Sequence, residues 1–201
     1  MNSDQVIETL EPASPAWAKR AMLPPRHQTG RPVSSAPMNG SAELAFDDNG
    51  NVAWDQIWDD FCDLALAGGP PHRETMLLFS NRDDIVDNRG AYERVVVELL
   101  RAIGMVTGWP TRRSTELGRF ELVCPDEEAA LWLEEAVNAE NVRAIRDGIV
   151  LQLPSGADFQ IKMEIRNVVT AVAKAHHYWA EHRASLDEIR RRSIAGSREF
   201  D

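Results

Sequence analysis

Apolar residues recur at helical spacing over one long stretch in the middle of the chain. Between Tyr92 and Val106 they fall three or four positions apart, which places them on one face of a helix. Asn88 precedes this stretch and suits the cap of a helix N-terminus, and Gly108 with Pro110 follows it and is typical of a helix end. The pattern therefore predicts a long amphipathic helix between Asn88 and Gly108.

Four other segments have the spacing or the start and stop signals of helices. Asp55 precedes an apolar stripe over 57–66 that ends at Gly68-Gly69, and the residues 125–128 combine a proline with carboxylates that favour a helix start. The longest of the four is expected over about 159–183. A shorter helix is expected over 185–194, because Ser185 and Glu188 have the spacing of a capping box.

Strand-like patterns lie between these helices. The residues 120–124 are apolar at alternate positions, and 142–146 and 149–153 alternate on either side of Asp147-Gly148, a dipeptide that favours a hairpin turn. Near the start of the ordered part, Asn49-Gly50 predicts a smaller hairpin. The segment 74–79 fits either a helix or a short buried strand, and the prolines before it favour the helix slightly.

The expected fold is α+β, with a small antiparallel sheet of about three to five strands packed by about four to six helices. The residues 42–196 are expected to form a single domain, and 197–201 a frayed tail. The first 41 residues hold six of the eleven prolines and few large apolar side chains, so they are expected to form a flexible arm.

Composition narrows the classes of function. The net charge of −10 argues against a nucleic-acid binder and against docking on anionic membranes, because both need a clustered basic surface. No stretch has the roughly 20 apolar residues of a membrane span, and the start of the chain has no secretory signal, so a cytoplasmic protein is expected. Cys62 and Cys124 both lie in apolar runs, where a thiol is usually buried and a disulfide framework is not expected.

The first candidate for chemistry is the loop 68–73. Its two glycines allow close backbone approach to a ligand, and its two prolines stiffen the turn. His72 supplies a titratable ring, and Arg73 supplies a guanidinium that can hold an anion with two hydrogen bonds. The alternative is a helix stop followed by a rigid connection, which is more common for such sequences.

The second candidate is the loop that follows the long helix. Trp109 stands close to Arg112 and Arg113, which form a basic island in an acidic protein. A tryptophan can stack on a ligand ring while arginines hold a carboxylate or phosphate. The alternative is a solvated loop in which the arginines pair with nearby carboxylates and Trp109 caps the core.

Histidines near the end of the chain are the third candidate. His176 lies at the edge of the apolar helix face, where it could act as a general base, whereas His177 lies on the opposite side. Their spacing does not match a metal-binding motif, so no metal site is predicted. Cys124 precedes a helix start, but the carboxylates beside it disfavour a thiolate, and a structural thiol is expected.

Two hypotheses for function remain. The first is a non-catalytic accessory protein that binds an anionic metabolite or a partner protein through Arg73, Trp109, Arg112 and Arg113. The alternative is a small enzyme in which His176 and His72 move protons while arginines hold an anionic substrate. No cofactor is indicated. A homo-oligomer is also consistent with the sequence, because Arg190–Arg192 could pair with an acidic helix face on another copy.

Overall fold

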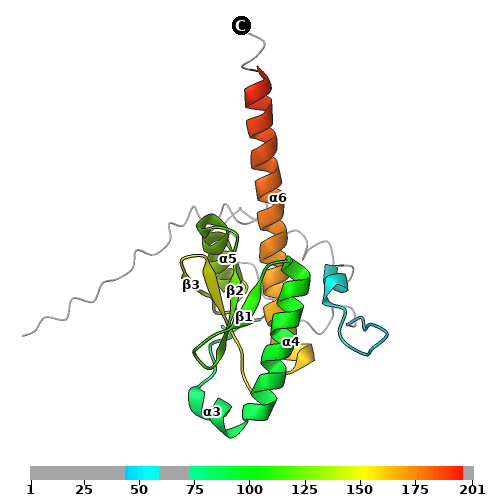
Figure 1. The fold of residues 1–201 in the computed structure, drawn as a ribbon, viewed down its shortest axis with the longest axis vertical. Helices are drawn as coiled ribbons and strands as arrows, with labels where there is room; N and C mark the ends of the chain where they lie inside the picture. The colour runs from blue at the N-terminus through cyan, green and yellow to red at the C-terminus, as the bar shows by residue number, and fades with distance from the viewer. Residues whose placement is uncertain (1–43, 59–72, 197–201) are drawn as a thin grey trace, which may run out of the picture.

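The computed structural model describes residues 44–58 and 73–196, and these form an α+β fold (Figure 1). The expected α+β class is therefore confirmed. The arm 1–41, the tail 197–201 and most of the expected helix at 57–66 lie outside the described residues. Within the part that is described, no helix combines the length and the apolar composition that crossing a membrane requires.

Four antiparallel strands form one sheet in the order β1-β2-β4-β3. The register pairs Phe120 with Leu153 and Leu122 with Leu151, and all four side chains are fully buried on one face. The alternation of buried and half-buried residues in the two central strands explains why this face carries the core. The strands are Thr111–Arg113 (β1), Arg119–Val123 (β2), Ile145–Asp147 (β3) and Val150–Pro154 (β4).

Three long helices pack with this sheet: Arg89–Thr107 (α4), Glu127–Ala139 (α5) and Arg166–Gly196 (α6). Helix α6 contacts both α4 and α5, so it joins the two halves of the fold. The caps follow the sequence: Gly108 ends α4 with a φ of 69°, and the Asp126 carboxylate accepts a hydrogen bond from the Ala129 N–H at 2.7 Å. The predicted long helix and the predicted helix start at 125–128 are confirmed.

Short elements complete the fold. The predicted hairpin around Asn49-Gly50 is present as a bridge between Phe46 and Val52, and Trp54 follows it with a fully buried side chain. A six-residue helix, α3, precedes α4 and is anchored by the fully buried Ile85. The bounds are Trp54–Trp58 for the 3-10 turn η3, Arg82–Asp87 for α3 and Ile161–Ile165 for the π-helical turn η4.

The structure decides one alternative that the sequence left open, and two sequence-based predictions are wrong in detail. The segment 74–79 is extended rather than helical, because the backbone of the buried Leu77 pairs with Asn141 and Arg143 on either side of Val142. The residues 111–113 form β1 instead of loop. Helix α6 continues through 183–185 as one helix, since no glycine or proline interrupts the chain between Arg166 and Ala195.

The outer edge of β3 is covered by side chains of α5. The Asn138 side chain donates to the Ala144 carbonyl at 2.9 Å and accepts from the Ala144 N–H at 3.2 Å. The Glu134 carboxylate accepts from the Arg146 N–H at 3.0 Å. These contacts satisfy backbone groups that would otherwise face an open sheet edge.

A buried ion pair links α6 with the end of α5. The Lys174 ammonium lies 2.5 Å from the Glu140 carboxylate, and the two side chains are 2% and 14% exposed. Burial raises the pKa of Glu140, although the ammonium opposes that shift. Two buried charges are tolerated here because each is close to its counterion.

We predict that Lys174→Met destabilises the protein by about 3–5 kcal/mol, because it leaves the Glu140 carboxylate buried without its counterion. Urea denaturation at neutral pH measures the effect. The double variant Lys174→Met/Glu140→Leu is expected to recover most of the loss, since neither charge of this pair then remains buried. A double variant as unstable as the single one would contradict this account.

Gly118 allows two segments of the chain to pass close to each other at the base of the sheet. A Cβ atom on Gly118 would lie 2.5 Å from the Ser80 carbonyl oxygen, and Gly118 also has a φ of +83°. Its N–H donates to the Tyr92 hydroxyl at 3.1 Å, and that hydroxyl also accepts from the buried Ser155 at 3.3 Å. These contacts hold the segment that leads into α3 against the ends of β2 and β4.

We predict that Gly118→Ala destabilises the protein more than Gly148→Ala does. Gly148 also has a positive φ, +56°, but a Cβ added to it would meet no atom within 4 Å. Its replacement is expected to cost about 1–2 kcal/mol from the backbone conformation alone, whereas Gly118→Ala adds the clash with Ser80. Equal losses in thermal denaturation would show that the close approach is unimportant.

Candidate functional site

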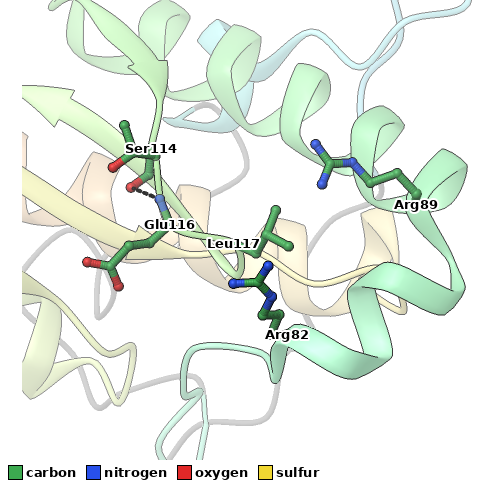
Figure 2. A pocket seen from close by; sticks show the side chains of 6 residues that line it. Arg82, Arg89, Ser114, Glu116 and Leu117 are labelled. Carbon is green, nitrogen blue, oxygen red and sulfur yellow. Dashed lines mark hydrogen bonds between the residues drawn. The ribbon is translucent and has the colours of Figure 1, made fainter.

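A cavity of about 500 Å3 opens between the α3–α4 corner and the loop that joins β1 to β2 (Figure 2). Figure 2 shows the side chains of Arg82 and Arg89 reaching from the helices toward this loop, while the Glu116 carboxylate turns to the other side. The volume of the cavity is within the range of sites that bind small molecules. The lining residues are Arg82, Arg89, Ser114, Thr115, Glu116 and Leu117. We call this cavity the arginine pocket.

The two arginines differ in how they are held. Arg82 is exposed and has no hydrogen-bond or ion-pair partner among the residues that the structure describes. Arg89 pairs with Glu93 one turn along α4 at 2.8 Å, and Glu93 also pairs with Arg113 of β1. Although desolvation opposes it, the hydrogen bonds from Arg113 and Arg89 lower the pKa of Glu93. The pocket thus combines one unpaired guanidinium with one fixed in place.

The loop wall of the pocket is polar. The Ser114 hydroxyl accepts from the Glu116 N–H at 3.2 Å, which shapes the turn and leaves its O–H as a donor. Thr115 is exposed at the tip. Glu116 pairs with Arg119 at 3.1 Å, and the Arg119 guanidinium also lies over the Phe79 ring at 4.4 Å.

The lining of the arginine pocket carries two arginines and one glutamate, so its own charge favours an anion. Arg113 and Arg119 stand nearby with Glu93, but α3 also carries three aspartates (83, 84 and 87), so the wider corner has no excess of positive charge. Guanidinium and hydroxyl donors suit a carboxylate or a phosphate.

A second cavity, of about 410 Å3, lies against the other side of α3. Asp84 and Asp158 contribute negative charge there, with Ser80 and Asn88 beside them. Both cavities use the α3–α4 corner, but they have opposite charge. An anion would therefore be attracted to the arginine pocket and repelled from the second cavity.

None of the arginines singled out from the sequence lines the arginine pocket. Arg112 is mostly exposed and pairs with Glu121 of the neighbouring strand at 2.6 Å, and Arg113 pairs with Glu93. The Arg73 side chain donates to the Thr75 carbonyl at 3.3 Å, and its own carbonyl accepts from Asn141. His72 lies outside the described residues.

Trp109 and His176 come together in a separate place. Their rings meet edge to face, with centroids 4.7 Å apart, and both are half-buried. Burial and the neighbouring His177 lower the pKa of His176, so its ring is neutral at physiological pH. Arg89 begins the 19-residue helix α4 and Trp109 follows its end, so about 28 Å of helix separates this pair from the arginine pocket.

The remaining candidate groups do not form a reactive centre. Burial and the neighbouring Asp126 raise the pKa of Cys124 to about 12, so the thiol is protonated and a poor nucleophile. His182 stacks on Trp132 with ring centroids 4.9 Å apart. Across 44–58 and 73–196, no three histidine, cysteine or acidic side chains are grouped so that they could hold a metal ion.

The sequence interpretation missed Arg82 and Arg89, although a signal for them exists. Each follows an asparagine, as Asn81-Arg82 and Asn88-Arg89, and each is the first residue of a helix. A cation at a helix N-terminus is unfavourable with respect to the dipole, so two such arginines seven positions apart are a local conflict. Conflicts of this kind are often found at functional sites.

Comparisons with protein-family models, with curated proteins and with solved structures find no match for this chain.

We predict that His176 makes the stability of the protein fall as the pH is lowered. Its folded pKa is below its ordinary value of 6.5, so the unfolded chain binds more protons between the two values and gains from acidification. Glu140 contributes in the opposite direction, because its folded pKa is raised. Because the His176→Gln variant keeps Glu140, a comparison with it isolates the contribution of His176 to the pH dependence of stability.

The measurement is the free energy of unfolding of both proteins at about pH 7.5 and about pH 5.5. The wild-type protein is expected to lose more stability than His176→Gln on acidification. An unchanged dependence in His176→Gln would contradict the prediction.

Proposed function

We propose that this chain is a non-catalytic binding protein that takes a small anionic ligand, bearing a carboxylate or a phosphate, in the arginine pocket. The observation that carries the proposal is the guanidinium of Arg82, unpaired among the described residues, which reaches toward the loop that joins β1 to β2 (Figure 2). An exposed arginine without a carboxylate partner retains all of its donors for a ligand.

The residues that line and surround the arginine pocket support ligand binding rather than catalysis. Among the described residues, neither a histidine, a cysteine nor a lysine lines the arginine pocket, and the hydroxyls of Ser114 and Thr115 have no base beside them in that lining. Nucleophilic and general acid–base catalysis both need such a neighbour within hydrogen-bond reach. The separation of His176 from the pocket by the length of α4 weighs in the same direction.

Two arginines of the strands β1 and β2 have a supporting role in this proposal. Arg113 shares Glu93 with Arg89, so it fixes the orientation of one guanidinium that would contact the ligand. Arg119 draws the Glu116 carboxylate away from the cavity. Both contacts reduce the local negative charge that an anion would meet.

The test is a titration with inorganic phosphate and with citrate, followed by NMR chemical shifts of backbone amides. In the wild-type protein the amides of Ser114–Leu117 are expected to move with ligand concentration. Arg82→Gln is expected to weaken binding about 10–100-fold, the usual effect of losing a charged hydrogen bond of about 1.5–3 kcal/mol.

Arg94→Gln is the matched control, because Arg94 is an exposed arginine of α4 that does not line the pocket. It removes the same charge and is expected to keep nearly the wild-type affinity. Equal weakening by both variants would mean that only net charge attracts the anion. If the amides of 114–117 do not shift in the wild-type protein, the ligand does not bind in this pocket.

A further inference from the structure

The cavity of about 410 Å3 beside α3 lies at the corner that α3 makes with α4 (Figure 1). Its lining comes from three parts of the chain: the segment before α3, the α3–α4 corner and the loop after β4. The described residues of this lining include two carboxylates and no arginine, lysine or histidine. They are Ser80, Asp84, Asn88, Ala91, Ala157 and Asp158. We call this cavity the aspartate pocket.

The charge of the aspartate pocket is not balanced by the protein around it. Within 44–58 and 73–196, no ion pair or hydrogen bond involves the side chain of Asp84 or of Asp158. A carboxylate makes its strongest hydrogen bonds with a charged donor, and the lining supplies none. The pocket therefore attracts a cation from solution.

Gly156 brings two acceptors of the lining together. A Cβ atom on Gly156 would lie 2.3 Å from the Ser80 hydroxyl oxygen and 2.7 Å from a carboxylate oxygen of Asp158. Gly156 does not have a positive φ, so a glycine is needed here for space rather than for its backbone conformation. Any side chain at this position would displace both acceptors. The Asn88 side chain makes no capping hydrogen bond to α4, so its amide oxygen is a further acceptor at the cavity.

The segments that carry the two carboxylates are anchored in the same small core. Asp84 precedes Ile85, which is fully buried with Tyr92 and Val96 in a cluster of its own. Ala157, the residue before Asp158, packs against this cluster. Both carboxylates are therefore held in place before a ligand arrives, which reduces the entropy that binding costs.

We propose that the aspartate pocket binds a small organic cation with an ammonium head. The head donates to the carboxylates of Asp84 and Asp158, and the small side chains of Ala91 and Ala157 leave room for its carbon chain. The cavity has the volume of a small-molecule site rather than that of a single ion. Among the described residues, no three histidine, cysteine or acidic side chains gather as a metal ion would require. The inference does not depend on the ligand proposed for the arginine pocket.

The experiment is a titration of the full chain with 1,4-diaminobutane, followed by NMR chemical shifts of backbone amides. The amides of Ala157 and Asp158 are expected to move in a saturable way, whereas those of 114–117 at the arginine pocket are expected to stay in place. Asp158→Asn is expected to weaken binding about 10–100-fold, the usual effect of losing a charged hydrogen bond. Ala91→Leu is expected to abolish the shifts because its larger side chain fills the cavity, and circular dichroism checks that both variants remain folded.

Two controls separate binding in the pocket from general attraction to an acidic protein. Asp83→Asn removes the same charge from an exposed aspartate of α3 that does not line the cavity, and it is expected to keep nearly the wild-type affinity. The uncharged 1,4-butanediol has the same chain length and is expected to cause no shift.

Four results would overturn the proposal. The first is the absence of saturable shifts at 157–158 in the wild-type protein up to about 50 mM diamine, a concentration that reveals even millimolar binding. The second is equal weakening by Asp83→Asn and Asp158→Asn, which would leave only net charge as the cause. The third is an equal response to the diol. The fourth is magnesium chloride producing the same shifts at lower concentration, which would assign the pocket to a metal ion.

Discussion

The fold depends on the burial of helix α6 between α4 and α5. Helix α6 contacts α4 along one side and α5 along the other, and seven of the ten residues from 166 to 175 are nine-tenths buried apolar side chains or a buried threonine. Such a helix would ordinarily carry no charge, yet Lys174 lies among these residues and is matched by Glu140 at the end of α5. The ion pair fixes the register of α5 on α6, because a shift by one residue would separate two buried charges.

The placement of the arginine pocket follows from that packing. Helix α4 packs along α6, and its N-terminus lies at the base of the sheet. Helix α3 and the loop that joins β1 to β2 both lie next to this N-terminus. Ile85 and Tyr92 tie this corner to Leu117 and to the strand ends. The cavity therefore lies between rigid elements on one side and a short loop on the other, which is the usual setting of binding residues.

The sequence predicted those parts of the fold that depend on local signals, and it failed where distant contacts decide. The caps at Asp126 and Gly108 and the turn at Gly148 are local, and each is where the pattern placed it. Leu77 is extended because of backbone partners more than sixty residues away, which no local pattern reports. Likewise, Arg112 and Arg113 became candidate binding residues because they form a basic island in an acidic protein. Whether an arginine meets a carboxylate or a cavity depends on the packing of α4 against β1, so the basic island at 112–113 did not point to Arg82 and Arg89.

The covered edge of β3 has a consequence for how this protein can aggregate. Asn138 and Glu134 bond the outer backbone groups of Ala144 and Arg146, so an incoming strand finds no free row of donors and acceptors on that side. The opposite edge, β1, is only three residues long, which limits the pairing that it can offer. Pairing at the β3 edge of the described sheet would therefore require α5 to detach first.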